Sequence, residues 1–238
     1  MKILAFDIWG DYGHFRKFFT TSSPLTFSFP PPSTIAGILG AICGLGKDDY
    51  LKVFSFEFCK LGLQIVHPVK KIRMGINLIN TKDFNWQPIR TKYHDPRTQI
   101  RTEFLKDPYF RIYVSHEDSR ILKVLEQNLI EHKSVYSVSL GLSELLADFK
   151  YVGVIEAEEL KDVCAEISTP IVASNLLDSG IAIEQGKKYF KEKMPLRMNS
   201  DRVVEVYEEV IYEPDGKAIK ARLKICYKID DGQHISLF

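Results

Sequence analysis

A corner of basic and aromatic residues near the N-terminus, joined by a proline-rich loop to two hydroxyl side chains, has the composition of a phosphate site. The residues are His14, Phe15, Arg16, Lys17, Ser33 and Thr34. Serine is a favoured N-cap, and the apolar spacing after Ser33 predicts a helix that begins near residue 34. The first N–H groups of a helix have no intrahelical partner and lie at its positive end. We therefore expect a phosphate-bearing ligand at this helix start.

The same predicted helix carries a face of small residues, Gly37, Gly40, Ala41 and Gly44. Glycine lowers helix stability, so this face needs a packing reason, such as the close approach of a sheet or of a ligand backbone. A helix buried under a sheet, with no ligand role, explains the spacing equally well.

Positive charge is concentrated in residues 70–106, although the net charge of the chain is only +1. The segment has three acidic side chains and nine basic ones, Lys70, Lys71, Arg73, Lys82, Arg90, Lys92, Arg97, Arg101 and Lys106. A basic arm on a mildly acidic body is typical of a protein that grips a polyanion at one place. A solvated basic loop is the alternative interpretation.

Aromatic residues are interleaved with this charge. Phe84, Trp86 and Tyr93 lie among arginines and lysines in a stretch that lacks strand or helix periodicity. Aromatic rings that stack on bases, between cations that bind phosphates, are typical of single-stranded RNA binding. We expect phosphate contacts from Arg16, Lys17, Arg73, Arg90, Lys92, Arg97 and Arg101, and stacking by Trp86 or Tyr93. The alternative is that the rings anchor the segment to the domain surface.

Catalytic motifs for nucleotide, hydride, zinc-protease and serine-hydrolase chemistry do not occur in the sequence. The six histidines lack metal-ligand spacing, so we expect no metal and no cofactor. Metal-independent cleavage of RNA remains as a catalytic option, because it needs only a general base and an acid or cation. The candidates are His14 or His94 together with Tyr12, Lys92 or Tyr93.

The four cysteines, Cys43, Cys59, Cys164 and Cys226, are widely spaced among apolar neighbours, which predicts buried free thiols in a reducing compartment. The longest uncharged apolar run, residues 34–46, is too short and too glycine-rich to span a bilayer. The N-terminus has no cleavable signal pattern. We therefore expect a cytoplasmic location and no membrane association.

The elements that must position these residues are predicted by periodicity. Strands are expected at 2–9, 56–69, 109–114 and 149–156, and helices at 34–45 and 121–129, the latter behind a capping box at 115–118. A further strand is expected at 71–79, followed by a long loop, and a short strand at 135–140 precedes a turn at Gly141 and a short helix. Strand, helix, strand, strand, helix, strand is the order of a split β-α-β fold of the ferredoxin type.

The last eighty or so residues are strand-rich. Residues 203–212 and 219–229 flank a turn at 213–216 and predict a hairpin, and 234–238 predict a final strand. The predicted fold class is α+β, with a ferredoxin-like domain at 1–157 that contains the basic insertion 70–106, and a β-rich region at 158–238.

Several of these segments together resemble the fifth family of CRISPR-associated proteins, a RAMP-superfamily subunit of type I Cascade complexes. The segments that carry the resemblance are His14-Phe15-Arg16, the loop 20–32, the helix 34–45, PVKKIRMGINLIN at 68–80, LKDP at 105–108, LGLSE at 140–144, and 195–202 with the closing hairpin. The resemblance spans nearly the whole chain.

The resemblance implies an RNA-recognition-like N-terminal domain whose inserted thumb, residues 70–106 here, holds the 5′ handle of the crRNA at one end of the complex. The implied partners are the crRNA, the repeating RAMP backbone subunit and the large subunit, with target DNA reached only through the complex. The expected function is a non-catalytic crRNA-binding subunit in antiviral defence. One branch of the family processes pre-crRNA with a tyrosine, a lysine and a histidine, so Lys92, Tyr93 and His94 make a metal-independent endoribonuclease the alternative.

Overall fold

The structure is a computed structural model of the chain, and it describes residues 1–20, 23–80, 90–92, 95–230 and 232–238. The described part is α+β and rich in strands. Its strands are β1 (Lys2–Trp9), β2 (Tyr12–Gly13), β3 (Cys59–Ile65), β4 (Lys71–Ile79), β5 (Arg97–Lys106), β6 (Tyr109–His116), β7 (Asp148–Ile167), β8 (Ile171–Val172), β9 (Leu176–Ile181), β10 (Phe190–Met198), β11 (Val204–Tyr212), β12 (Ile219–Ile229) and β13 (His234–Ile235). Its helices are α1 (Pro32–Cys43), α2 (Tyr50–Val53), α3 (Ser119–Ile130) and a short 3₁₀ turn, η2 (Ala173–Asn175).

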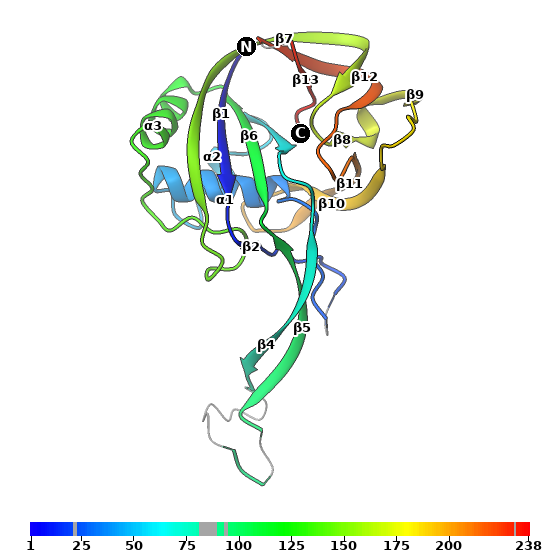
Figure 1. The fold of residues 1–238 in the computed structure, drawn as a ribbon. Helices are drawn as coiled ribbons and strands as arrows, with labels where there is room; N and C mark the ends of the chain where they lie inside the picture. Colours follow the sequence, from blue (N-terminus) through cyan, green and yellow to red (C-terminus); the bar gives the residue numbers. More distant parts are fainter. Residues whose placement is uncertain (21–22, 81–89, 93–94, 231) are drawn as a thin grey trace.

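The main sheet of the described residues has the strand order β3-β6-β1-β7-β13-β12-β9. In the chain, α1 lies between β1 and β3, and α3 lies between β6 and β7. Alternate residues of β1 face opposite sides, as expected for a strand. Leu4, Phe6 and Ile8 belong to the core that includes α1 and α3, whereas Ile3 and Ala5 pack with the C-terminal strands. Both faces of the sheet are thus covered around β1, and α1 crosses its strands (Figure 1).

The basic segment forms a long two-stranded ribbon. β4 and β5 pair antiparallel from Lys71 opposite Leu105 to Ile79 opposite Arg97, and β2 joins β5 at the base. The ribbon projects away from the rest of the molecule (Figure 1). The prediction of a strand at 71–79 is confirmed, but the prediction of a loop at 97–106 is wrong. A strand in that position fixes the direction of every side chain at the base of the segment.

Helix α1 begins before the predicted position. Its N-cap is Pro31 and Pro32 is its first residue, so Ser33 lies in the first turn and caps nothing. Proline is favoured at this position because its fixed φ suits a helix and the first turn does not use its missing N–H. Gly44 ends the helix with a φ of 78° and donates its N–H to the Gly40 carbonyl.

The small-residue face of α1 has a packing explanation. A Cβ on Gly40 would lie 2.7 Å from Cβ of Tyr50, and one on Gly44 would lie 2.9 Å from the Val135 side chain. The backbone N–H of Tyr136 also donates to the Ala41 carbonyl at 3.0 Å. The chain therefore packs α2 and the segment after α3 directly on the backbone of α1, and the small side chains leave the room for it.

Helix α3 has a different cap from the predicted one. Asp118 is the N-cap and accepts the backbone N–H of Arg120 at 2.9 Å. Ser115 still belongs to β6, which pairs with β3 as far as His116 opposite Cys59. The predicted capping box at 115–118 is wrong because sheet pairing keeps the chain extended as far as His116, so the helix starts later.

The segment between α3 and β7 is irregular. Neither the strand predicted at 135–140 nor the short helix after Gly141 forms, and one isolated bridge joins Ser139 to Leu146. Gly141 has a φ of 102°, and a Cβ there would lie 1.9 Å from the His14 carbonyl oxygen. This segment therefore supports the N-terminal corner by backbone contact.

Strand β7 links the two predicted regions. Its first half pairs with β1, from Asp148 opposite Trp9 to Glu156 opposite Lys2, and its second half pairs with β12. The predicted boundary after residue 157 falls inside this continuous strand. The division into 1–157 and 158–238 stays a prediction.

The predicted hairpin of residues 203–229 is wrong. β11 lies in a separate sheet of order β10-β11-β8, whereas β12 lies in the main sheet. The turn between them is held by Glu213, which is buried and accepts the N–H groups of Asp215 and Lys217 at 2.8 and 3.0 Å. Gly216, with a φ of 81°, packs against the Ile65 carbonyl. The turn residues therefore direct the chain from one sheet to the other.

The cysteines are free, and the expectation of burial fails for one of them. Cys59 and Cys226 are buried and Cys43 is partly buried, but Cys164 is exposed on β7. Burial raises the pKa of Cys43 to about 11 and that of Cys59 to about 12. Cys164 is thus the accessible thiol among the described residues.

Candidate nucleic-acid interface

His14 and Phe15 form the buried part of the N-terminal corner, each with 3% of its surface exposed. Nδ1 of His14 lies 2.7 Å from the Glu103 carbonyl, to which it donates a proton, and the ring lies 5.5 Å from that of Phe104. Burial is the largest influence on the His14 pKa and lowers it. These two side chains thus join the corner to β5 and present no surface to a ligand.

Arg16 is the exposed member of the corner. Its backbone bridges to Thr26, and Nη2 donates to the Thr20 carbonyl at 3.1 Å. The Phe15 N–H donates to Oγ1 of Thr26 at 2.9 Å, which ties the same loop together. The loop therefore holds Arg16 beside the ribbon base with most of its donors available.

Lys17 has its charge satisfied within the protein. Nζ forms an ion pair with Glu192 of β10, and the two side chains are only 16% and 10% exposed. Nζ also lies 5.7 Å from the centre of the Phe27 ring. The predicted role of Lys17 in phosphate binding therefore competes with a half-buried internal pair.

Glu103 on β5 is the centre of the ribbon base. Its carboxylate lies 3.7 Å from Nζ of Lys71 and 3.7 Å from Nε of Arg73, and it accepts the Thr26 N–H at 3.3 Å. Lys71 also donates to the Thr26 carbonyl at 2.9 Å. Burial is the largest influence on the Lys71 pKa and lowers it. Sequence reasoning counted Glu103 only as an acid, although its place opposite Arg73 in two alternating strands could have indicated a pair.

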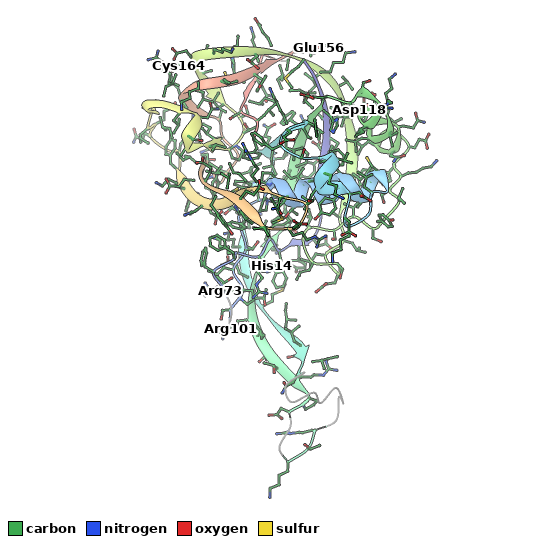
Figure 2. All side chains as sticks on the ribbon, turned by 180° about the vertical axis from the view of Figure 1, so that it is seen from behind. His14, Arg73, Arg101, Asp118, Glu156 and Cys164 are labelled. Atoms are coloured by element: carbon green, nitrogen blue, oxygen red, sulfur yellow. The ribbon has the colours of Figure 1, made fainter. Side chains whose placement is uncertain are left out.

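The ribbon has two unlike faces, because residues directly opposite one another in antiparallel strands share a face. One face is mainly polar and basic. It consists of Lys71, Arg73, Gly75, Asn77, Arg97, Gln99, Arg101 and Glu103, with Leu105 at the base and Ile79 at the far end. The other is apolar, with threonines, and consists of Ile72, Phe104, Met74, Thr102, Ile76, Ile100, Leu78 and Thr98. Arg101 lies opposite Gly75, where the Gln99 side chain packs against the glycine, with Nε2 3.1 Å from the position of a Cβ. Figure 2 shows His14 at the ribbon base, with Arg73 and Arg101 further along it.

Arg97 and Arg101 are exposed, and within the described residues neither forms an ion pair. Arg73 keeps 68% of its side-chain surface despite its contact with Glu103. These three arginines therefore offer the accessible positive charge of the ribbon face.

The far end of the ribbon is described only in part. Nε of Arg90 lies 3.2 Å from Asp95, with both side chains largely exposed, and Lys92 is also exposed. Trp86, Tyr93 and His94 lie outside the described residues. The stacking role of Trp86 and Tyr93, and the convergence of Lys92, Tyr93 and His94, therefore stay predictions.

Ser33 and Thr34 lie on the body of the molecule, in the first turn of α1. They line a hollow of about 430 Å³ together with Gly37, Tyr50 and Arg202. Arg202, from the turn between β10 and β11, was not among the predicted site residues. No local sequence pattern connects it to α1, because the contact depends on how the second sheet packs.

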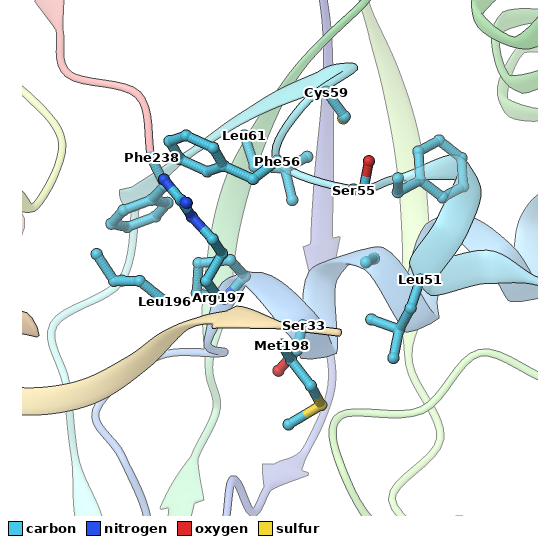
Figure 3. Close-up of a pocket in the computed structure, with 13 residues that line it drawn as sticks. Ser33, Leu51, Ser55, Phe56, Cys59, Leu61, Leu196, Arg197, Met198 and Phe238 are labelled. Atoms are coloured by element: carbon cyan, nitrogen blue, oxygen red, sulfur yellow. The ribbon is translucent and has the colours of Figure 1, made fainter. Parts of the chain in front are cut away.

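A second cavity adjoins the start of α1 and is lined by residues of α1, α2, β3 and β10 (Figure 3). Arg197 lies 4.2 Å from the centre of the Phe56 ring there, and the buried Oγ of Ser55 has no partner among the described residues. The cavity measures about 30 Å³, which is the size of one water molecule. It is too small for a nucleotide.

Among the residues that the structure describes, no three His, Cys, Asp or Glu side chains are grouped so that they could hold a metal ion. None of the described helices has the length and apolar character needed to cross a bilayer.

Residues 3–211 match the model of the family described as "CRISPR-associated protein (Cas_Cas5)". This match covers most of the chain. The protein belongs to the Cas5 family of CRISPR-associated proteins. No curated protein shows significant sequence similarity to this Cas5 chain.

Solved structures resemble this Cas5 protein in fold. A CRISPR protein from Archaeoglobus fulgidus has a TM-score of 0.59 at 14% identity, with 99% of this chain and 98% of that chain covered. A chain of a "CRISPR RNA-guided surveillance complex" has a TM-score of 0.53 at 11% identity, with 92% and 91% covered. A chain of the Type III-B Cmr-beta bound to cognate target RNA and AMPPnP has a TM-score of 0.50 at 16% identity, with 92% and 86% covered. At these identities the likeness concerns the fold alone.

Proposed function

We propose that this Cas5 protein is the subunit of a CRISPR surveillance complex that binds the guide RNA, and that the basic face of the β4–β5 ribbon makes the main contact. The observation that carries the proposal is the accessible charge of Arg73, Arg97 and Arg101 on one face of a projecting ribbon. Cations along a strand face attract a phosphate backbone without reading its sequence. Family membership and the complexes in which similar folds occur support the same function.

The first part of the chain is proposed to be the ferredoxin-like domain of this subunit. Its elements run in the order β1, α1, β3, β6, α3, β7, and the four strands lie in the order β3-β6-β1-β7. This is the β-α-β-β-α-β arrangement that many RNA-binding domains use. The ribbon enters between β3 and β6, which is where the thumb was expected.

Capping of the 5′ handle is the finer form of the proposal. The ribbon base, with Arg16 beside it, and the hollow at Ser33 and Thr34 both belong to the N-terminal corner. An RNA end that follows the ribbon face toward the body would meet this corner. Contacts with target DNA would be made by the whole complex rather than by this chain.

The apolar face of the ribbon supports the proposal that other protein subunits are partners. Leu78 on this face is 47% exposed, and a two-stranded ribbon has no core of its own to cover such a residue. We propose that the repeating RAMP backbone subunit covers this face while RNA lies on the basic one. The large subunit is the other proposed protein partner.

A salt series of RNA-binding measurements tests the function. Replacement of both Arg97 and Arg101 by glutamine should weaken binding to an RNA copy of the CRISPR repeat. The log–log salt slope should become shallower by about 1.4, because each phosphate contact on a single strand contributes about 0.7. The matched control is Arg120→Gln, which removes an exposed arginine of α3 that pairs with Asp118. Equal affinity and equal slope for the double variant and the wild type would reject the proposal.

Cleavage of pre-crRNA by Lys92, Tyr93 and His94 is the alternative function. Of the two histidines considered as the general base, His14 is buried and donates its Nδ1 proton to a backbone carbonyl, which favours His94. Our first proposal is binding without cleavage. Incubation of the protein with repeat RNA in EDTA decides between them, because specific cleavage that is lost in Tyr93→Phe and His94→Gln would establish the enzyme.

A further inference from the structure

Tyr50 lies between α1 and an arginine from the far end of the chain. One side of its ring packs on the glycine face of α1, where a Cβ on Gly37 would be 3.8 Å from Cε2 and one on Gly40 would be 2.7 Å from Cβ. The guanidinium of Arg202 lies over the ring, 5.8 Å from its centre. The ring face attracts the cation, and a guanidinium carries several N–H donors in a planar fork that suits a phosphate.

Arg202 is positioned by the tight turn between β10 and β11. Asn199 closes this turn, since its N–H donates to the Val203 carbonyl at 3.0 Å and its Oδ1 accepts the Val203 N–H at 2.9 Å. Within the described residues Arg202 forms no ion pair. The turn thus carries a cation that is not held in an ion pair by any carboxylate that the structure describes.

The hollow beside Arg202 has the lining of an anion site. It measures about 430 Å³, and its lining contains the aliphatic hydroxyl groups of Ser33, Thr34 and Ser139 and the phenolic hydroxyl of Tyr50, together with Gly37 and Gly141. No carboxylate of the residues that the structure describes lines it. Hydroxyl groups and arginine are common donors to the phosphates of nucleic acids, and the glycines allow a close approach to backbone.

We propose that this hollow binds one phosphate group of the RNA strand, with Arg202 as its cation and the hydroxyls of Ser33, Thr34 and Ser139 as further donors. The inference rests on the proposed function, since it assumes that the RNA reaches the body of the protein. The phosphate is either an internal phosphodiester or a terminal phosphomonoester. Either source offers the same negatively charged oxygens to the same donors.

Binding of repeat RNA to Arg202→Gln across a salt series tests the contact. Its affinity should fall about tenfold at low salt, and its salt slope should become shallower by about 0.7, the contribution of one phosphate. Arg202→Lys keeps the charge but loses the planar fork, so it should retain the slope while binding more weakly than the wild type. Arg120→Gln again serves as the matched control and should behave as the wild type.

Modified RNAs then locate the phosphate. In a series in which each RNA carries one uncharged methylphosphonate linkage, or lacks its 5′ or its 3′ phosphate, one member should bind the wild type about tenfold more weakly. Arg202→Gln should bind this modified RNA with the same affinity as it binds the unmodified RNA. If the RNA that lacks a terminal phosphate loses affinity, the bound group is a phosphomonoester. If an RNA with one methylphosphonate linkage loses affinity, the bound group is the internal phosphodiester at that position.

The outcomes separate this inference from the proposed function. Wild-type binding and slope in Arg202→Gln, together with weakened binding in Arg97→Gln/Arg101→Gln, would overturn the inference and leave the function standing. The inference would also be overturned if every modified RNA lost affinity for Arg202→Gln by the same factor as for the wild type. Arg202 would then act only through its long-range charge. No RNA binding by the wild type would reject the proposed function itself.

Discussion

Glu103 shows how one acidic residue organises the base of a basic ribbon. Its carboxylate pairs with Lys71 and Arg73 and accepts the Thr26 N–H, while its backbone carbonyl accepts the N–H of His14. Four connections from three segments therefore meet at one residue. Arg73 remains 68% exposed within this cluster, so the cluster positions the base of the ribbon and leaves the arginines of its face accessible.

Replacement of Glu103 by glutamine should lower stability and leave RNA affinity undiminished. The amide can still accept the Thr26 N–H, but Lys71, whose side chain is 28% exposed, loses its ion pair with Glu103 and keeps only the charge of Glu192 nearby. We expect a loss of about 1–2 kcal/mol in the free energy of unfolding, measured by urea denaturation. RNA affinity at low salt should rise slightly, because a negative charge has left the basic face.

Glu205→Gln is the control for this substitution, since Glu205 is exposed on β11 and no partner of its carboxylate is described. It should unfold as the wild type does. Wild-type stability for Glu103→Gln would show that the cluster at the ribbon base contributes nothing to folding.

His14 should make the stability of the protein depend on pH. Burial lowers its pKa in the folded state below the ordinary value of about 6.5. Above the ordinary value His14 is neutral in both the folded and the unfolded state, so its contribution to stability is fully present. As the pH falls through the unfolded pKa toward the folded one, only the unfolded state takes up the proton, so stability falls by at most about 1.4 kcal/mol per pH unit.

His14→Asn provides the comparison, because its amide can still donate to the Glu103 carbonyl but does not titrate. The wild type should lose more stability than His14→Asn between about pH 7 and pH 5, measured as the difference between their unfolding free energies at each pH. All other ionisable groups are the same in both proteins, so their contributions cancel in the difference. A difference that stays constant over this range would contradict the burial of a neutral His14.

Residue types at the site could be predicted from the sequence, but burial and pairing could not. The cluster from His14 to Lys17 was found by composition, yet two of its members are core residues and Lys17 is paired with Glu192, far away in the chain. The expectation of a buried thiol fails at Cys164 because a strand with one open face exposes alternate residues. Such outcomes depend on which elements pack together, and local sequence does not encode this.

The positions of the glycines in helix α1 are explained by the elements that pack on it. Gly40 admits the Cβ of Tyr50, and Gly44 both ends the helix and admits Val135. The sequence predicted that the small-residue face needs a close neighbour, but not whether this would be a sheet, a ligand or another part of the chain. The neighbours in the structure are α2 and the segment after α3.

Alanine substitutions on α1 should have opposite effects at two neighbouring glycines. Gly40→Ala places a Cβ 2.7 Å from Cβ of Tyr50, and overpacking of this kind costs about 1–3 kcal/mol. Gly37→Ala meets its nearest atom at 3.8 Å, an ordinary contact, so the gain in helix propensity of about 1 kcal/mol should remain. Thermal unfolding should give a lower Tm for Gly40→Ala and a higher one for Gly37→Ala. A higher Tm for both variants would mean that Tyr50 does not pack closely on the helix.

Strands with clear alternation were predicted well, and those with mixed faces were not. Lys71–Ile79 alternates polar and apolar residues and was expected as β4. Its partner β5 also alternates, but threonines on its apolar face weaken the pattern, so the segment was assigned to a loop. The hairpin predicted around residues 213–216 had suitable turn residues, yet Glu213 and Gly216 carry the chain into another sheet. Turn composition indicates a change of direction and leaves the strand partner undetermined.

In the whole molecule, strand β7 and a shared core cluster connect the N-terminal and C-terminal parts of the chain. One strand pairs with β1 in its first half and with β12 in its second half. Ile3, Ala5 and Tyr113 from the first part share a core cluster with Tyr227 and Ile235 from the last part. The predicted order of the early strands and helices agrees with their order in the chain. Nothing in the sequence indicated that the C-terminal strands extend the same sheet.

The shared strand and core lead us to expect that the two parts of the chain unfold in one transition. Cys59 on β3 and Cys226 on β12 are 3% and 0% exposed, and burial raises the pKa of both thiols, so neither should react with iodoacetamide until its part unfolds. Pulse labelling across a urea series, read peptide by peptide by mass spectrometry, should give the same midpoint for both. Exposed Cys164 is the internal control and should react at every urea concentration. Labelling of Cys226 at clearly lower urea than Cys59 would instead show that residues 158–238 unfold separately, with the boundary inside β7.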